Sequence, residues 1–338
     1  MKIDCLEYEG EGKRCLHLMK EVDKGLCTLP GHFACPEWDK RHGKGVKVDY
    51  TNFSMSYSRG RSWAKCRRLY HYEYRLGLQL KPEYQSIPLR LGSLASKYLG
   101  YIHSESKSGL KPMSESLQDA LQGVEDVKRT PFMALEVLMS EYQYMDVCNI
   151  KGEAEKEGVW QEEGFPRVHG FLDLAEHGST EDVPIWGWEF KYSGRMSNWS
   201  KFVLTPQLST YFLCFPTMPR VTVRVFRNPD LRKGAKEGIE EFLARLRTDI
   251  KRRPKYYIED MVYWREEFDL IGWKNQLKAI HRDILKAEEE DSFYSNQTAC
   301  FSPWQCDYYP ICSTDGLIPE NMYQNKPKRE GANDNTGV

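Results

Sequence analysis

Apolar residues recur at helical spacing over 92–147 and then give way to short β-rich runs. The helical stretch predicts three successive helices, the third of which opens with Thr130 and Pro131, residue types that suit a helix N-terminus. Three later runs are typical of strands: RVHGFLDLAE, IWGWEFKYS and, after an intervening helix, VTVRVFRN. An amphipathic helix and a long helix over about 264–290 follow. This order predicts an α/β or α+β body whose small sheet is partly covered on both faces.

Composition narrows the class of protein. The chain has 338 residues, 40% hydrophobic and 29% charged, which is typical of a folded protein of about two domains, or of one large domain with an appendage. Lysine and arginine total 48 against 49 acidic residues, so a net charge of −1 offers no overall attraction for a polyanion. A nucleic acid would have to be held by local basic patches. The absence of a long apolar stretch and of an apolar signal region predicts no membrane contact and a cytoplasmic location.

Ten cysteines are unevenly distributed and divide the chain. We expect residues 1–50 to form a small appendage, which contains Cys5, Cys15, Cys27 and Cys35. Such a segment is too short to build a core alone, so tetrahedral Zn²⁺ is one way to stabilise it; the alternative is that it packs on the body. Cys300, Cys306 and Cys312 close the body, taken as 51–315, and residues 316–338 predict a disordered tail.

Charged residues in the strand-like centre are the candidates for chemistry. Side chains alternate along a strand, so Asp173 is a carboxylate on the face of His169 and Phe171. Glu189 and Lys191 share one face of the next strand. If the two strands form a hairpin, two carboxylates and an ammonium group meet, as a Mg²⁺-dependent phosphodiester hydrolase requires. The alternative is an ordinary Glu189–Lys191 ion pair, with Asp173 in a turn network.

Three motifs in succession resemble those of RecB-like PD-(D/E)xK nucleases: GFLD at 170–173, WEFKYS at 188–193 and QLSTY at 207–211. The resemblance covers roughly 52–312 and implies a restriction-endonuclease-like α/β core, with a small mixed β-sheet flanked by helices and a helical insertion. Thr205 and Pro206 predict the start of a helix on which Gln207 and Tyr211 share a face. That face could point at a metal centre or at the DNA backbone. The alternative is an amphipathic helix with Tyr211 in the core.

The resemblance also implies an activity: a Mg²⁺- or Mn²⁺-dependent deoxyribonuclease, with an exonuclease on single-stranded or end-containing DNA as the favoured form. It would work in replication, recombination or repair, with partner proteins of those processes, in a microbial cell or a virus-infected host. The residues that it assigns to catalysis are Asp173, Glu189, Lys191, Gln207 and Tyr211. Asp173 and Glu189 would bind the metal with the backbone carbonyl of Phe190. Lys191 would orient the attacking water, and the helix pair would position the substrate or the lysine. The alternative is a noncatalytic DNA-binding or assembly protein that retains this fold.

An upstream cysteine and the C-terminal trio resemble the iron-sulfur branch of these nucleases, which includes CRISPR-associated and AddB-type members. The resemblance implies a [4Fe-4S] cluster held by Cys66, Cys300, Cys306 and Cys312. Two departures stand out: the trio has C-x5-C-x5-C spacing where the family commonly has C-x2-C-x5-C, and Ser96 stands near the position of a metal-binding histidine. His103, seven residues further on, lies about 10 Å away by helix rise and is a poor substitute. A zinc site or reduced core thiols are the alternatives to the cluster.

Basic residues cluster between 59 and 75, with six Lys or Arg against one Glu and several interleaved aromatic residues. This mixture can contact phosphates and stack bases of a single strand. The predicted DNA contacts are Arg59, Arg61, Lys65, Arg67 and Arg68. A second basic run, KRRPK at 251–255, ends a helix, where the helix dipole favours positive charge in any case.

Overall fold

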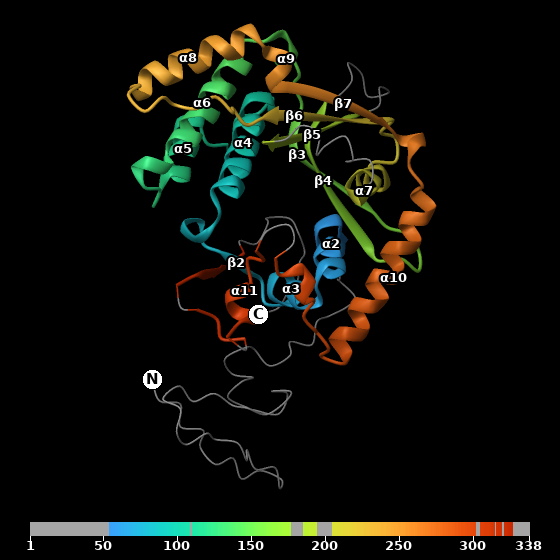
Figure 1. Ribbon diagram of the computed structural model, residues 1–338. Helices are drawn as coiled ribbons and strands as arrows, with labels where there is room; N and C mark the ends of the chain where they lie inside the picture. The colour runs from blue at the N-terminus through green and yellow to red at the C-terminus, as the bar shows by residue number, and fades with distance from the viewer. Residues whose placement is uncertain are drawn as a thin grey trace, which may run out of the picture.

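A mixed sheet forms the centre of the computed structural model, which describes residues 54–108, 110–176, 185–194, 205–301, 305–314, 316–319 and 321–326. In this part of the chain six strands pair in the order β1-β4-β5-β6-β7, with β3 beside β4 (Figure 1). Their bounds are β1 Ser54–Ser56, β3 Glu153–Trp160, β4 Arg167–Glu176, β5 Trp186–Ser193, β6 Arg220–Arg227 and β7 Ile258–Trp264. The β1–β4 and β5–β6 pairs are parallel, and the other three pairs are antiparallel. The predicted α/β class with a mixed sheet is therefore confirmed. The predicted zinc cysteines of the appendage lie outside the described residues.

Strand β4 has two partners in succession along one edge. β3 occupies the other edge over most of the length of β4. On the shared edge, β1 pairs with β4 up to His169, and β5 pairs with it from Leu174 onward. Among the described strands none pairs with residues 170–173 on this edge. The two partners thus diverge around the stretch that ends in Asp173.

Helices cover both faces of the sheet (Figure 1). On one face lie α4 Ile87–His103 and α6 Thr130–Tyr142, backed by α5 Met113–Leu121, α8 Ile239–Arg252 and the short α9 Pro254–Tyr257. On the other lie α2 Tyr57–Lys65, α7 Pro206–Cys214 and α10 Leu270–Glu289. A separate apolar cluster, which includes Tyr72, Tyr308 and Ile311, joins the two ends of the described chain. None of the described helices is long and apolar enough to cross a membrane.

The smaller cluster contains α3 Arg67–Tyr70, a π-helical turn His71–Arg75, β2 Leu78–Leu80, α11 Tyr309–Cys312 and β8 Tyr323–Asn325. β8 pairs antiparallel with β2. Tyr323 is 8% exposed, its ring stacks on Tyr308 at 5.8 Å, and its hydroxyl donates to the Asp307 carbonyl at 2.7 Å. The prediction of a disordered tail from residue 316 is therefore wrong for 321–326, because a buried aromatic residue anchors this strand. Residues 327–338 lie outside the described chain.

The sequence pattern predicted some elements and missed others. The three helices of the insertion and strands β4, β5 and β6 are confirmed. The predicted long helix begins later, at Leu270, because 258–264 forms β7 and the Asp269 side chain accepts from the Gly272 backbone at 2.8 Å, which caps the helix. Strands β1 and β3 were not predicted.

A buried polar chain supports β5 from the face covered by α4 and α6. The His103 ring stacks on Phe190 at 5.1 Å, and its Nδ1 lies 3.0 Å from the Ile150 carbonyl. Its Nε2 lies 2.8 Å from the Tyr142 hydroxyl, to which Arg224 donates at 2.7 Å. Since Nδ1 can only donate to a carbonyl, Nε2 must accept from Tyr142. Every member of this chain is satisfied, so it fixes one arrangement behind β5.

Replacing Tyr323 with Ala should lower the free energy of unfolding by about 3 kcal/mol, because a buried aromatic ring is lost from the small cluster. Chemical denaturation monitored by circular dichroism measures this change. Gln324→Ala is the matched control, since the Gln324 side chain is exposed on the same strand. Equal stability of the two variants would show that β8 does not anchor the chain.

His103 should make stability depend on pH below neutrality. Burial lowers the pKa of His103 from 6.5 to about 4. Between these values the unfolded chain binds the extra proton, so stability falls as the pH drops from 6.5 toward 4, by about 3 kcal/mol in all. In His103→Asn, which keeps a donor near the Nδ1 position, this part of the pH dependence should disappear. If the free energies of unfolding of the two proteins changed with pH in parallel, His103 would not be the source of this pH dependence.

Candidate functional site

The five residues predicted to act together lie together. Glu189 on β5 is 1% exposed and accepts hydrogen bonds at both carboxylate oxygens. Lys191 and Gln207 donate to Oε1, the latter at 2.9 Å, and the Tyr211 hydroxyl donates to Oε2 at 2.6 Å. Gln207 Nε2 also contacts the Tyr211 hydroxyl at 2.6 Å. The i and i+4 positions of α7, which were expected to share a face, thus converge on one buried carboxylate.

Helix α7 reaches Glu189 because small residues let it approach the sheet. The helix begins at Pro206 after Thr205 in the N-cap position, as predicted, although the Thr205 side chain makes no capping hydrogen bond. A Cβ atom at Gly170 would lie 3.2 Å from Cys214 Sγ and 3.4 Å from Tyr211 Cδ1. A larger residue at 170 would push α7 away from β4. Tyr211 is 5% exposed and belongs to the core on this face, so the packing and site interpretations of Tyr211 hold together.

Strict alternation along β4 does not explain how Asp173 reaches the site. Leu172 packs on the α7 face, where Glu189 also lies, whereas Leu174 packs on the opposite face with Trp188. The side of the sheet to which the β4 side chains point therefore changes at Asp173. Glu155, at the corresponding position of β3, has a φ of 53° and is absent from the regular pairing, which passes from Ala154 to Lys156. A left-handed residue inside a strand is a local distortion of the kind found beside active sites.

The prediction that Asp173 shares a face with Glu189 was correct in outcome, but alternation was the wrong reason. Asp173 Oδ2 accepts from the Phe190 backbone N–H at 2.7 Å, at the point where β4 and β5 diverge. No sequence signal identified Glu155, because nothing about a glutamate in a charged strand predicts a left-handed conformation. The distortion was visible only in the structure.

The site places two buried carboxyl groups close together beside one lysine. Burial and then the charge of Glu189 raise the pKa of Asp173 well above its usual range. Burial opposes the charge on Lys191, but Glu189 and Asp173 outweigh it and raise the pKa of the lysine. Burial, with Glu189 next, also raises the pKa of Tyr211, so this hydroxyl stays a donor. A divalent cation would relieve the repulsion between the carboxylates, and their hard oxygen atoms suit Mg²⁺ or Mn²⁺.

Two carboxylates do not make a complete metal cage. Among the described residues no three His, Cys, Asp or Glu side chains stand close enough to hold an ion between them. The remaining ligands would be water and backbone oxygen, as Mg²⁺ sites commonly have. Phe190 meets Asp173 through its backbone N–H, so the predicted role of its carbonyl remains a proposal. His103 is fully buried behind the sheet, and His169 Nδ1 pairs with Glu157 Oε1 at 2.5 Å.

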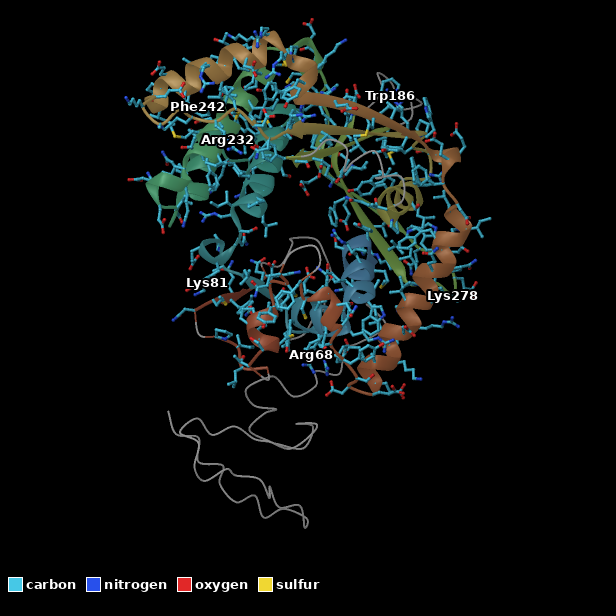
Figure 2. The ribbon with its side chains drawn as sticks, viewed as in Figure 1. Arg68, Lys81, Trp186, Arg232, Phe242 and Lys278 are labelled. Carbon is cyan, nitrogen blue, oxygen red and sulfur yellow. The ribbon has the colours of Figure 1, made fainter. Side chains whose placement is uncertain are left out.

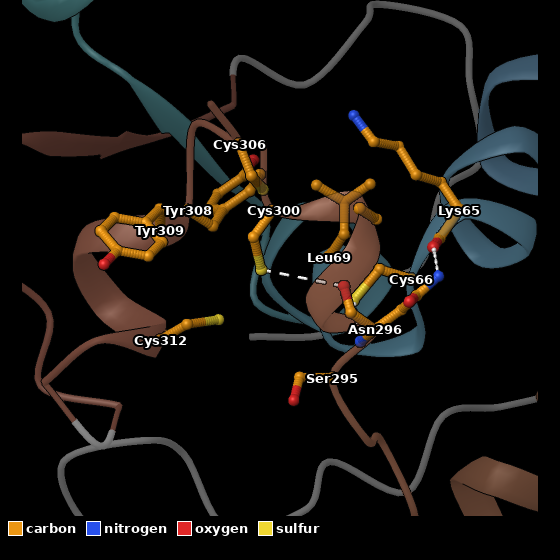
Figure 3. Close-up of a pocket in the computed structure, with 11 residues that line it drawn as sticks. Lys65, Cys66, Leu69, Ser295, Asn296, Cys300, Cys306, Tyr308, Tyr309 and Cys312 are labelled. Carbon is orange, nitrogen blue, oxygen red and sulfur yellow. Dashed lines mark hydrogen bonds between the residues drawn. The ribbon is translucent and has the colours of Figure 1, made fainter. Parts of the chain in front are cut away.

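The four cysteines predicted to hold a cluster line one pocket (Figure 3). Cys66 lies at the junction of α2 and α3, and its Sγ accepts from the Asn296 backbone N–H at 3.2 Å. Cys300, Cys306 and Cys312 enter from the segment after α10. The six cysteines of the described residues are all free thiols, and burial raises the pKa of Cys306 and of Cys312. The fold thus brings thiols from both ends of the described chain to one place.

The predicted DNA-contact residues divide into buried and accessible ones. Arg59 is 7% exposed, donates to the Ser54 carbonyl and lies over the Tyr74 ring. The prediction for Arg59 is therefore corrected, because a buried guanidinium has no surface to offer a phosphate. Arg67 is partly exposed, lies between the rings of Trp63 and Tyr294 at 4.8 and 4.5 Å, and pairs with Asp283.

Arg68 donates to the Phe293 carbonyl at 3.4 Å, so it too contributes to the fold. Arg61 is exposed and Lys65 half-buried. These two residues, with Arg67 and Arg68, remain available for the predicted contact.

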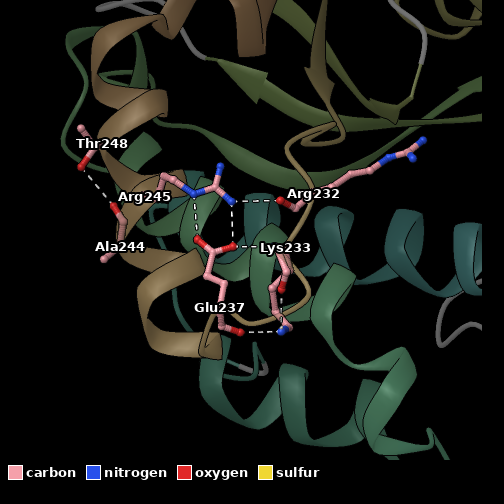
Figure 4. A network of polar contacts seen from close by, with 7 residues as sticks. Arg232, Lys233, Glu237, Ala244, Arg245 and Thr248 are labelled. Carbon is pink, nitrogen blue, oxygen red and sulfur yellow. Dashed lines mark hydrogen bonds and ion pairs between the residues drawn. The ribbon is translucent and has the colours of Figure 1, made fainter.

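The second basic region is held in ion pairs. Arg252 and Arg253 both pair with Asp249, which supports the interpretation of KRRPK as a helix end. In the middle of α8, Arg245 forms two hydrogen bonds, at 2.8 Å each, with Glu237 of the loop before the helix (Figure 4). The Arg245 guanidinium lowers the pKa of Glu237 to about 2. These arginines stabilise the helix and its preceding loop.

Comparison with known proteins agrees with the geometry. Residues 54–313 match the PD-(D/E)XK nuclease superfamily, a span that begins at β1 and includes the site and all four pocket cysteines. No curated protein matches the chain at a significant level. The matched span is more than half of the chain, and the fold within it is a mixed sheet flanked by helices. The chain therefore belongs to the PD-(D/E)XK nuclease superfamily of metal-dependent nucleases, which act on DNA.

Proposed function

We propose that this protein is a Mg²⁺- or Mn²⁺-dependent deoxyribonuclease that acts as an exonuclease on single-stranded or end-containing DNA. The observation that carries the proposal is the buried Glu189 carboxylate, which Lys191, Gln207 and Tyr211 hold beside Asp173. A carboxylate with this many donors has a fixed orientation, and a second buried carboxyl group beside it gives a divalent cation two hard oxygen ligands. The preference for single strands or ends, the exonuclease mode, and a place in replication, recombination or repair come from the resemblance alone.

Each residue has a task that its position supports. Asp173, Glu189 and the Phe190 carbonyl would hold the divalent metal, which when bound acts as a Lewis acid on the phosphate and its attacking water. Lys191 is 21% exposed at its side chain, against 2% for Glu189, so its ammonium group can also reach a substrate. It would orient the attacking water or neutralise charge on the scissile phosphate. Gln207 and Tyr211 act as positioning residues, because both contact the carboxylate and so orient the lysine bound to it.

The proposal can be tested by cleavage of end-labelled DNA with Mg²⁺ or Mn²⁺. Asp173→Asn, Glu189→Gln and Lys191→Met should each lower the rate by at least two orders of magnitude, because a metal or its charge partner contributes several kcal/mol to the transition state. Glu153→Gln is the control, since Glu153 lies on the neighbouring strand and pairs at the surface with Lys156. Cleavage by Asp173→Asn at the wild-type rate would contradict the catalytic assignment. Binding of DNA without cleavage under either metal would favour the noncatalytic alternative.

We further propose that the four pocket cysteines hold a [4Fe-4S] cluster. The donor set fits, because four thiols and no carboxylate line the pocket, and four thiolates are the usual ligands of such a cluster. The thiols do not converge as they stand, so ligation would draw the 300–312 segment toward Cys66. The cluster would be structural, since it would join the helix before the catalytic sheet to the segment after it. DNA would be bound beside it by Arg61, Lys65, Arg67 and Arg68.

Metal analysis of one anaerobic preparation tests the cluster. Brown protein with about four iron atoms per chain is the expected result. In Cys306→Ala, colour and thermal stability should both fall, because ligand binding energy becomes folding energy. Asp173→Asn should keep both. Colourless protein without iron would contradict the cluster. Zinc in the same preparation would bear on the separate proposal for Cys5, Cys15, Cys27 and Cys35, which mutation of those residues would then test.

A further inference from the structure

Two tryptophans and an arginine stand side by side at one end of the sheet, away from the residues described above. Arg220 begins β6 and pairs with Trp264, the last residue of β7. Trp186 begins β5, one position before the Gly187–Val221 pair, so it lies level with Arg220 on the other side. Figure 2 shows Trp186 at the outer end of the sheet. The three side chains thus form a cross-strand row, which we call the tryptophan–arginine row.

The guanidinium of Arg220 lies between the two indole rings. Its Cζ is 4.4 Å from the centre of the Trp186 ring and 5.8 Å from that of Trp264, both within cation–π range. Even so, Trp186 is 38% exposed and Trp264 43% exposed, and the neighbouring Val262 is 42% exposed. Large aromatic residues left this open at one place are typical of a surface that binds something.

Arg220 has donors to offer. Among the described residues the Arg220 side chain makes no hydrogen bond or ion pair, and its buried Nε has no partner. Arg224, four residues along the same strand, binds Asp260 through both Nε and Nη2 at 2.6 Å. Carboxylates of the same region are already engaged: Glu176 accepts from Trp188 Nε1 at 2.8 Å and Glu267 from the Trp264 backbone at 2.7 Å. The row therefore presents a cation that is oriented by aromatic rings and that pairs with none of the described carboxylates.

The distance between the two tryptophans favours an extended ligand. Trp186 and Trp264 are two strands apart, which corresponds to about 10 Å. Bases stacked in a duplex are only about 3.4 Å apart, so neighbouring bases could reach both rings only in an unstacked, extended strand. A phosphate between two such bases would meet Arg220. Aromatic rings that stack bases and a cation that binds the backbone are the two parts of a single-strand site.

We propose that Trp186, Arg220 and Trp264 form a second binding site for single-stranded nucleic acid, separate from the catalytic site. Along β5, Trp186 is three residues from Glu189, about 10 Å, but it lies with Trp188 and Phe190 on the opposite face of the sheet. A strand bound to the row therefore leaves the catalytic site open for another part of the same molecule. The proposal rests on the proposed nuclease function for its choice of polyanion, and it goes beyond that function in naming where a distant part of the substrate binds.

The test measures binding of fluorescently labelled oligo(dT) by anisotropy, in a Lys191→Met background without divalent metal, so that no cleavage intervenes. Trp186→Ala and Trp264→Ala should each weaken binding by about tenfold, because each removes a stacking ring. Trp264→Phe keeps an aromatic ring and should therefore retain most of the affinity that Trp264→Ala loses. Arg220→Lys keeps the charge but loses the planar stack and should weaken binding less than Arg220→Ala. Arg220→Ala should also reduce the salt slope by about one. Tyr144→Ala is the control, because Tyr144 is 88% exposed and lies just after α6, outside the row.

A second measurement separates this proposal from the nuclease function. With Lys191 intact, the row variants should cleave a small chromogenic phosphodiester at the wild-type rate, because it is too short to reach the row. If wild-type protein cleaves nothing but Trp264→Ala still weakens oligo(dT) binding, the nuclease function fails and the second site stands. Unchanged affinity in both tryptophan variants would overturn the second site, even if Arg220→Ala weakens binding. Equal losses for duplex and single-stranded DNA would also overturn it.

Discussion

Glu189 is a carboxylate removed almost entirely from water, and the arrangement around it follows from the need to satisfy its charge. A buried ionised group is stable only if its oxygens are hydrogen-bonded and its charge is countered. Here one donor comes from its own strand, Lys191, and two come from successive turns of α7. This requirement fixes α7 against the sheet, and Gly170 gives it the space to approach. Asp173 then places a second carboxyl group beside Glu189, and Lys191 is shared between the two, so a divalent cation would find two oxygen ligands here.

Packing and hydrogen bonds also fix the opposite face of β5. Phe190 lies between Glu189 and Lys191 in sequence and points the other way, into a core closed by the His103 ring. His103 is bound in turn to Tyr142 and, through it, to Arg224 on β6. Polar networks therefore hold both faces of β5 in place. A strand constrained in this way can hold two charged groups in position while its neighbour β4 bends away.

Much of this arrangement could be predicted from the sequence, and the failures have physical causes. Alternation and apolar content identified β4, β5 and β6, because these strands are buried and have regular patterns. β3 was missed because its exposed residues are charged and only its partner strand shows that it is a strand. The change of face at Asp173 lies opposite the left-handed Glu155, and the strand at 323–325 is anchored by contacts of Tyr323 with residues distant in sequence. Local patterns carry no information about either feature.

The central claim is that Asp173 and Glu189 form one metal site together. The most direct test is a crystal structure of the protein soaked in Mn²⁺, with an anomalous difference map that locates the ion. The account predicts a peak within ligand distance of both carboxylates, and its loss in Asp173→Asn. A peak bound elsewhere, or no peak although Mn²⁺ supports cleavage, would show that these two carboxylates are only an ion-pair network with Lys191.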